Sequence, residues 1–132
     1  MTDSPESFQI KKTQRIRRSQ DFARVYEEKQ RAGDEHLLVF GLRNDLGITR
    51  FGLSVSKKHG GSVKRARLKR LLREAFRLSQ HELPAGLDLI LIPRQNSGAK
   101  LADYRESLQR AATKLDRRLE KSAPPASQEA KP

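Results

Sequence analysis

The stretch GGSVKRARLKRLLREAF, residues 60–76, concentrates residue types whose chemistry is anion binding. Between Lys64 and Arg77 there are seven basic residues and a single acid, Glu74. A guanidinium group binds phosphate through two parallel hydrogen bonds, and a lysine ammonium binds it as a point charge. Like charges one helical turn apart repel each other and destabilise an isolated helix. We therefore expect an external polyanion to offset this repulsion.

The residue types that perform catalysis are present but form no recognisable constellation. The three histidines, His36, His59 and His81, are scattered without motif spacing. No Ser/His/Asp set or pair of carboxylates stands out, and there is no cysteine. We predict neither a catalytic residue nor a metal-binding residue in the protein, which disfavours a stand-alone protein ribonuclease.

The charge of the whole chain is strongly positive and unevenly distributed. The 132 residues include 28 Lys and Arg against 16 Asp and Glu, a net charge of +12. Residues 52–77 hold nine of the basic residues and one acid, so about a fifth of the chain carries +8. Such a field favours nucleic acid first and an anionic membrane second.

The composition also indicates the cellular compartment of the protein. The absence of cysteine excludes a disulfide framework, and no apolar run approaches the ~20 residues of a membrane span. The first twelve residues lack the apolar stretch of a secretory signal. We expect a cytoplasmic protein.

The basic residues lie on a segment with helical periodicity, expected over about 63–79 and capped by Ser62. Leu68, Leu71, Leu72, Ala75 and Phe76 form the stripe of a core-facing helix, and the basic residues occupy an arc of roughly 160° on the other side. One face would dock on the protein and the other would meet the anion. A membrane-surface helix is disfavoured because the core needs the apolar face and the chain has no Trp for an interfacial anchor.

Five further elements are expected around this helix. A short helix capped by Ser19 carries Phe22, Val25 and Tyr26, and a long amphipathic helix begins near Gly98. Residues 36–43 and 49–58 are expected to form an antiparallel hairpin. Residues 87–94 are apolar on both faces and predict a central strand. This order predicts an α+β fold, a two-layer sandwich of helices on a small sheet. The expected domain spans 13–120, between a flexible segment, 1–12, and a disordered tail, 121–132.

The segment RFGLSVSKKHGGSVKRARLKRLLREAF resembles the signature of the bacterial ribonuclease P protein subunit. The matching positions are Arg50, Gly52, Val55-Ser56-Lys57-Lys58, Gly60, Val63, Arg65-Ala66-Arg67, Lys69-Arg70 and Arg73-Glu74-x-Phe76. The resemblance covers about residues 11–120 in the order and spacing of elements. One position departs from the pattern, because the family has Asn between the two arginines and this chain has Ala66, which makes no side-chain hydrogen bond.

The resemblance implies a function. The family's protein assists a catalytic RNA that removes the 5′ leader from precursor tRNA, with the Mg²⁺ ions held by the RNA. It implies that the protein alone is inactive, binds as a monomer with one copy per RNA, and has a mixed sheet with a left-handed crossover between parallel strands.

The resemblance also implies two RNA-binding surfaces. The catalytic RNA would contact Arg65, Arg67, Lys69, Arg70 and Arg73 on the basic helix. The single-stranded leader would occupy a cleft between this helix and the sheet, lined by Phe22, Tyr26 and Phe40, with Lys57 and Lys58 nearby. Aromatic stacking tolerates any base, which suits leaders of varied sequence. Without the resemblance, ordinary core packing is the better interpretation of Phe22 and Phe40.

Two other classes of binding protein remain open on composition alone. The main alternative is a small ribosomal protein or another structural RNA-binding protein, which only the signature disfavours. A DNA-binding regulator would place the basic helix in the major groove. Such regulators usually dimerise, and we find no dimerisation motif, so DNA is not an expected partner.

Overall fold

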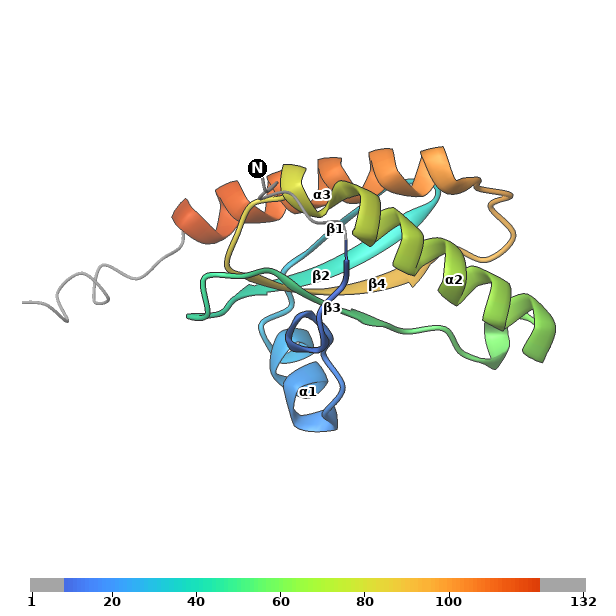
Figure 1. Ribbon diagram of the computed structural model, residues 1–132, viewed down its shortest axis with the longest axis horizontal. Helices are drawn as coiled ribbons and strands as arrows, with labels where there is room; N and C mark the ends of the chain where they lie inside the picture. Colours follow the sequence, from blue (N-terminus) through green and yellow to red (C-terminus); the bar gives the residue numbers. More distant parts are fainter. Residues whose placement is uncertain (1–8, 122–132) are drawn as a thin grey trace, which may run out of the picture.

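A computed structural model describes residues 9–121 of the chain, in which three α-helices pack on a four-stranded mixed sheet (Figure 1). In chain order, the elements are α1 (Ser19–Glu27), β1 (Arg31–Gly33), β2 (Leu37–Arg43), β3 (Arg50–Leu53), α2 (Ser62–Ser79), β4 (Leu87–Pro93) and α3 (Leu101–Lys121). Short 3₁₀ turns occupy Lys12–Gln14, Lys57–His59 and Gln80–Glu82. Most of the segments predicted to be flexible (1–12) and disordered (121–132) lies outside the described residues.

The sheet has the strand order β1-β2-β4-β3, with β4 antiparallel to β2 and parallel to β3. The prediction that residues 87–94 form a central strand is confirmed. The prediction of a hairpin between 36–43 and 49–58 is wrong, because β4 lies between β2 and β3 and bonds to both. A strand buried on both faces gains most in the middle of a sheet.

The two faces of the sheet are covered unequally (Figure 1). Helices α2 and α3 cover one face, where Phe51 of β3 stacks on Phe76 of α2 with ring centroids 4.2 Å apart. On β2, Gly41 approaches Leu115 of α3 so closely that an added Cβ would lie 3.0 Å from its side chain. Helix α1 packs on the opposite face, so the expected two-layer sandwich gains a partial third layer.

Several element boundaries differ from the sequence-based expectation. The residues that cap α1 and α2 are Arg18 and Gly61, so neither Ser19 nor Ser62 is the cap. The predicted strand 49–58 ends at Leu53, and the chain then turns through Lys57–His59. Strand β1 was not predicted, because its three residues are too few to show an alternation of apolar and polar side chains.

A buried ion pair joins the two parallel strands on the α1 face. Arg50 of β3 and Asp88 of β4 are register partners, and Arg50 donates two hydrogen bonds, 2.9 Å from Nε and 2.6 Å from an Nη atom, to the carboxylate. Asn44 donates a further bond of 2.7 Å to the same carboxylate. The hydrogen bonds to Asp88 raise the pKa of Arg50 above its ordinary value. Arg50 therefore serves the fold and is not available to bind an anion.

Candidate nucleic-acid interface

The outward face of α2 presents cations without carboxylate partners. Leu72, Ala75 and Phe76 are buried and fix the orientation of the helix. Arg67, Lys69 and Arg70 are exposed, and none forms an ion pair within residues 9–121. Ala66, at the position where the resembling family has Asn, is exposed among them. This arrangement matches the two-faced helix predicted from the sequence.

Arg65, Lys69 and Arg73 stand one turn apart along one side of α2 and line a shallow hollow of about 250 Å³ with Ser62 and Ala66. Arg65 is half-buried, and its Nε donates a 3.1 Å hydrogen bond to the carbonyl of Gly60, which ties the helix to the turn before it. These three basic side chains therefore border a concave surface rather than a flat patch.

The single acid of α2 is used within the helix. Glu74 accepts three hydrogen bonds of 2.7–3.2 Å from the guanidinium of Arg77. These bonds lower the pKa of Glu74 and raise that of Arg77. Glu74 therefore neutralises Arg77 and leaves Arg67, Lys69, Arg70 and Arg73 uncompensated.

A further cationic side chain that sequence reasoning missed lies beside this face. Residue Arg15 forms a β-bridge to Phe51, and its guanidinium lies 5.1 Å from the centre of that ring. Burial lowers the pKa of Arg15, and the charges of Arg17 and Arg73 lower it further. The basic surface thus extends from α2 onto the segment that precedes α1. This segment lies close to α2 because Arg15 pairs with Phe51 of β3.

The predicted leader-binding aromatics lie together on the α1 side of the sheet. Tyr26 of α1 and Phe40 of β2 meet edge to face with ring centroids 5.0 Å apart. The ring of Phe22 covers Gly52 so closely that an added Cβ would lie 2.6 Å from its tip. The three aromatic side chains are half-buried, so each keeps exposed surface. We call Phe22, Tyr26 and Phe40 the aromatic face.

The three aromatic residues do not lie between α2 and the sheet, where the leader cleft was predicted. The space between α2 and the sheet is filled by core residues, including Phe51, Leu72 and Phe76. Side chains alternate along a strand. Phe51 points to α2 whereas its neighbour Gly52 faces Phe22 of α1. The aromatic face therefore lies on the opposite side of the sheet from α2.

Lys57 and Lys58 lie in the 3₁₀ turn beyond β3 and are exposed. The turn is held by His59, which is buried. Its Nδ1 accepts a 3.0 Å hydrogen bond from the Ser56 N–H, so Nε2 is the nitrogen that donates to the Pro93 carbonyl, 2.7 Å away. His59 therefore positions the two lysines. In the described part of the chain, no hydrogen bond or ring contact joins either lysine to the aromatic face.

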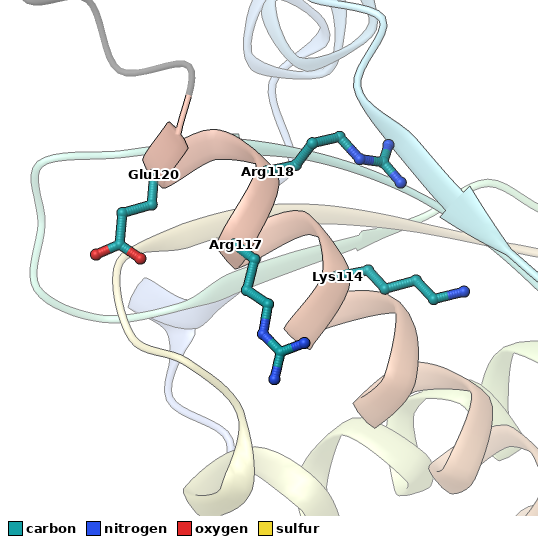
Figure 2. A pocket seen from close by; sticks show the side chains of 4 residues that line it. All are labelled: Lys114, Arg117, Arg118 and Glu120. Carbon is teal, nitrogen blue, oxygen red and sulfur yellow. The ribbon is translucent and has the colours of Figure 1, made fainter.

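A second basic group lies at the far end of α3, where Lys114, Arg117, Arg118 and Glu120 border an open hollow of about 470 Å³ (Figure 2). Arg118 donates a 2.6 Å hydrogen bond to the carbonyl of Arg31. Glu120 lies among these bases, so the charge of this group is of mixed sign, unlike that of the outward face of α2.

Residues 9–121 contain neither a candidate membrane span nor a candidate metal cluster. None of the described helices is long and apolar enough to cross a membrane. No group of three or more His, Asp or Glu in this range is placed to hold a metal ion.

Comparison with known proteins identifies relatives over most of the chain. The family model described as Ribonuclease P matches residues 10–116. The ribonuclease P protein component of Serratia proteamaculans is 44% identical over 108 residues, which cover 78% of this chain and 84% of that protein. The component of Syntrophus aciditrophicus is 39% identical over 95 residues, 71% of this chain and 80% of that protein.

Solved structures share the fold. A mutant of the Staphylococcus aureus RNase P protein superposes with a TM-score of 0.69 and 30% identity, covering 80% of this chain and 90% of that one. The RNase P protein of Thermotoga maritima gives a TM-score of 0.65 and 31% identity over 71% of this chain and 90% of that one. The family model, the curated relatives and the solved structures agree with the sequence signature and with the uncompensated cations of α2. The chain therefore belongs to the ribonuclease P protein family and is the protein subunit of ribonuclease P, an endoribonuclease that matures the 5′ ends of tRNA.

Proposed function

We propose that this subunit binds two RNA segments on opposite sides of its sheet. Membership of the family implies a ribonuclease P RNA as partner. The outward face of α2 (Arg65, Arg67, Lys69, Arg70 and Arg73) contacts this catalytic RNA. The aromatic face binds the single-stranded 5′ leader of precursor tRNA, and Lys57 and Lys58 contact its phosphates. The observation that carries the proposal is that these five cations on α2 lack carboxylate partners in residues 9–121, while partly exposed aromatic rings gather on the other face.

The division of labour follows from what each face offers. Arginine forks bind phosphate in fixed geometry, which suits a folded RNA whose phosphates are held in place. Aromatic rings stack on any base, which suits a leader whose sequence varies. Tyr26 also carries a hydroxyl that can hydrogen bond at the edge of the stacked base.

The chemistry in this proposal belongs to the RNA subunit. That RNA would hold the Mg²⁺ ions, whose chemistry would be to activate water and to stabilise phosphate oxygens. The protein's own residues bind and orient: α2 holds the RNA, and the aromatic face holds the leader so that the cleavage site is presented. One protein monomer acts per RNA, and DNA is not a partner. The β3–α2–β4 unit, whose strands are parallel neighbours, takes the left-handed crossover that the family resemblance implies.

Reconstitution tests the proposal. Purified protein, a bacterial ribonuclease P RNA and a precursor tRNA are combined at low Mg²⁺, where the RNA alone cleaves slowly. We expect slow leader release by the RNA alone, fast release when RNA and protein are both present, and no release by the protein alone, because the protein supplies binding and not a catalytic group. Specific release by the protein without RNA, surviving repurification, contradicts the proposal. No stimulation by the protein contradicts it as well.

A further inference from the structure

A second hollow lies between the first turns of α2 and the loop that joins β4 to α3. It is larger than the hollow lined by Arg65, Lys69 and Arg73. Its volume is about 520 Å³, within the range of ~300–1,000 Å³ typical of small-molecule sites. Leu68 and Leu71 of α2 and Leu101 of α3 form an apolar floor. Four basic side chains stand around it: Lys64, Arg67, Arg94 and Lys100. We call this the loop pocket.

The charge of the loop pocket is of one sign. None of the residues that line it is an Asp or Glu. Lys64 donates a 3.3 Å hydrogen bond to the side-chain oxygen of Asn96, and Arg94 donates a 3.0 Å bond to the backbone carbonyl of Asp34. Asp103, near Lys100 in sequence, accepts a bond from the Lys100 backbone N–H. Lys64 and Arg94 are therefore oriented by neutral groups, and none of the four cations forms an ion pair within residues 9–121.

The walls of the loop pocket are fixed by the fold. His59, which lines it, is bonded to Ser56 and to the Pro93 carbonyl. Asn96 adopts a left-handed conformation with φ of 56° and so reverses the chain after β4. Leu68, Leu71 and Leu101 pack against the main core. A pocket built from such parts exists before its ligand arrives, which lowers the entropy lost on binding.

The combination of an apolar floor and a basic rim selects a ligand with a flat apolar part and a phosphate. A phosphate alone gains nothing from three leucines, and a purely apolar ligand gains nothing from four cations. A nucleotide has both parts, with a base that can lie on the leucines and a phosphate that can reach the rim. Arg67 also has a planar guanidinium that can stack on a base.

We propose that the loop pocket binds one unstacked nucleotide of the ribonuclease P RNA, with its base on Leu68, Leu71 and Leu101 and its phosphate at Lys64 and Lys100. The proposal rests on the proposed function and deepens it, because it adds to the phosphate contacts of α2 a place where one base is held. The source is the ribonuclease P RNA rather than the leader because Lys64 and Arg67 belong to α2. The aromatic face lies across the sheet.

The first test uses the full-length protein labelled with ¹⁵N and titrated with AMP, adenosine and ribose 5-phosphate. We expect AMP to shift the backbone amide signals of Gly98 and Leu101 saturably, and ribose 5-phosphate to bind about tenfold more weakly, since it lacks the base. Lys100→Gln should weaken AMP binding about tenfold by removing one charge-assisted contact. The matched control is Arg117→Gln, which removes one cation from the far end of α3 (Figure 2) and should leave AMP binding unchanged. Equal binding of AMP and ribose 5-phosphate overturns the base-binding inference.

The second test places the nucleotide in the assembled holoenzyme. Base edges of the ribonuclease P RNA are probed chemically with the wild-type protein, with Lys100→Gln and with Arg117→Gln. We expect one base of this RNA to be protected by the wild-type and Arg117→Gln proteins and exposed with Lys100→Gln. Protection that falls in the leader or is unchanged by Lys100→Gln overturns the inference. Leader cleavage by the wild-type holoenzyme at low Mg²⁺, measured in the same samples, shows independently whether the proposed function holds.

Discussion

At the scale of single residues, Gly52 is the position where the aromatic face depends on the absence of a side chain. An added Cβ at Gly52 would lie 2.6 Å from the tip of the Phe22 ring, closer than real contacts permit. The glycine therefore allows α1 to lie on the sheet with Phe22 against the backbone of β3. Gly52 appears in the sequence signature, but its partner Phe22, 30 residues earlier, is known only from the structure.

We expect Gly52→Ala to destabilise the protein by roughly 1–3 kcal/mol, as overpacking usually does, and to displace Phe22. Thermal unfolding measures the stability. The matched variant is Gly52→Ala combined with Phe22→Leu, which shortens the obstructing side chain. The double variant should be more stable than the sum of the two single changes predicts. Strict additivity would show that the contact with Phe22 is not the cause.

At the scale of elements, the turn between β1 and β2 is fixed by one carboxylate. Asp34 Oδ1 accepts hydrogen bonds from the N–H groups of His36 and Leu37, and Oδ2 accepts bonds from Ser107 and Arg110 of α3. Burial disfavours the charged form, but the bonds from Ser107, from the two N–H groups and from Arg110 outweigh it and lower the pKa of Asp34 to about 2. One residue thus closes the turn and ties it to α3.

The low pKa of Asp34 predicts how stability changes with pH. The folded state binds a proton at this carboxyl less readily than the unfolded chain, so its contribution is complete above about pH 4 and is lost as the pH falls toward 2. We expect Asp34→Asn to lower the free energy of unfolding by roughly 1–2 kcal/mol at pH 7. This difference should narrow between pH 4 and 3, as measured by urea unfolding. Glu35→Gln, at an exposed neighbouring carboxylate, should have little effect at either pH. A loss for Asp34→Asn that does not depend on pH would contradict the assignment.

The elements could be predicted from the sequence, but their pairing could not. The three helices and strands β2 and β4 follow from apolar periodicity, which is a local signal. The pairing of β3 with β4 is not a local signal, because β4 begins 34 residues beyond the end of β3. The sequence of the helix between them does not indicate which strand β4 will pair with. Since the hairpin was assumed, the face on which Phe40 lies relative to α2 could not be derived. The sequence therefore predicted which residue types form the proposed surfaces, but not on which side of the sheet the aromatic residues lie.

At the scale of the whole molecule, the sheet separates two surfaces of different chemistry. One side carries α2 with Arg67, Lys69 and Arg70, and the other carries α1 with Phe22 and Tyr26 (Figure 1). The core between them, including Phe51, Leu89 and Leu91, is buried. A substitution that is exposed on one side therefore has no direct path of contact to the other, and the effects of the two surfaces on binding should be separable.

The separation of the two surfaces can be tested in the holoenzyme, which binds either precursor tRNA or mature tRNA. Arg70→Ala should weaken binding of the protein to the ribonuclease P RNA and reduce the salt dependence of that affinity by about one unit of slope, as the loss of one phosphate contact does. Tyr26→Ala should lower holoenzyme affinity for precursor tRNA by about 1–3 kcal/mol, the value of one stacked base, and leave mature tRNA binding unchanged. Thermal unfolding of both variants controls for folding, because Tyr26 also contacts Phe40. If Tyr26→Ala weakens the two tRNAs equally, or lowers only the melting temperature, the aromatic face supports the fold and the leader binds elsewhere.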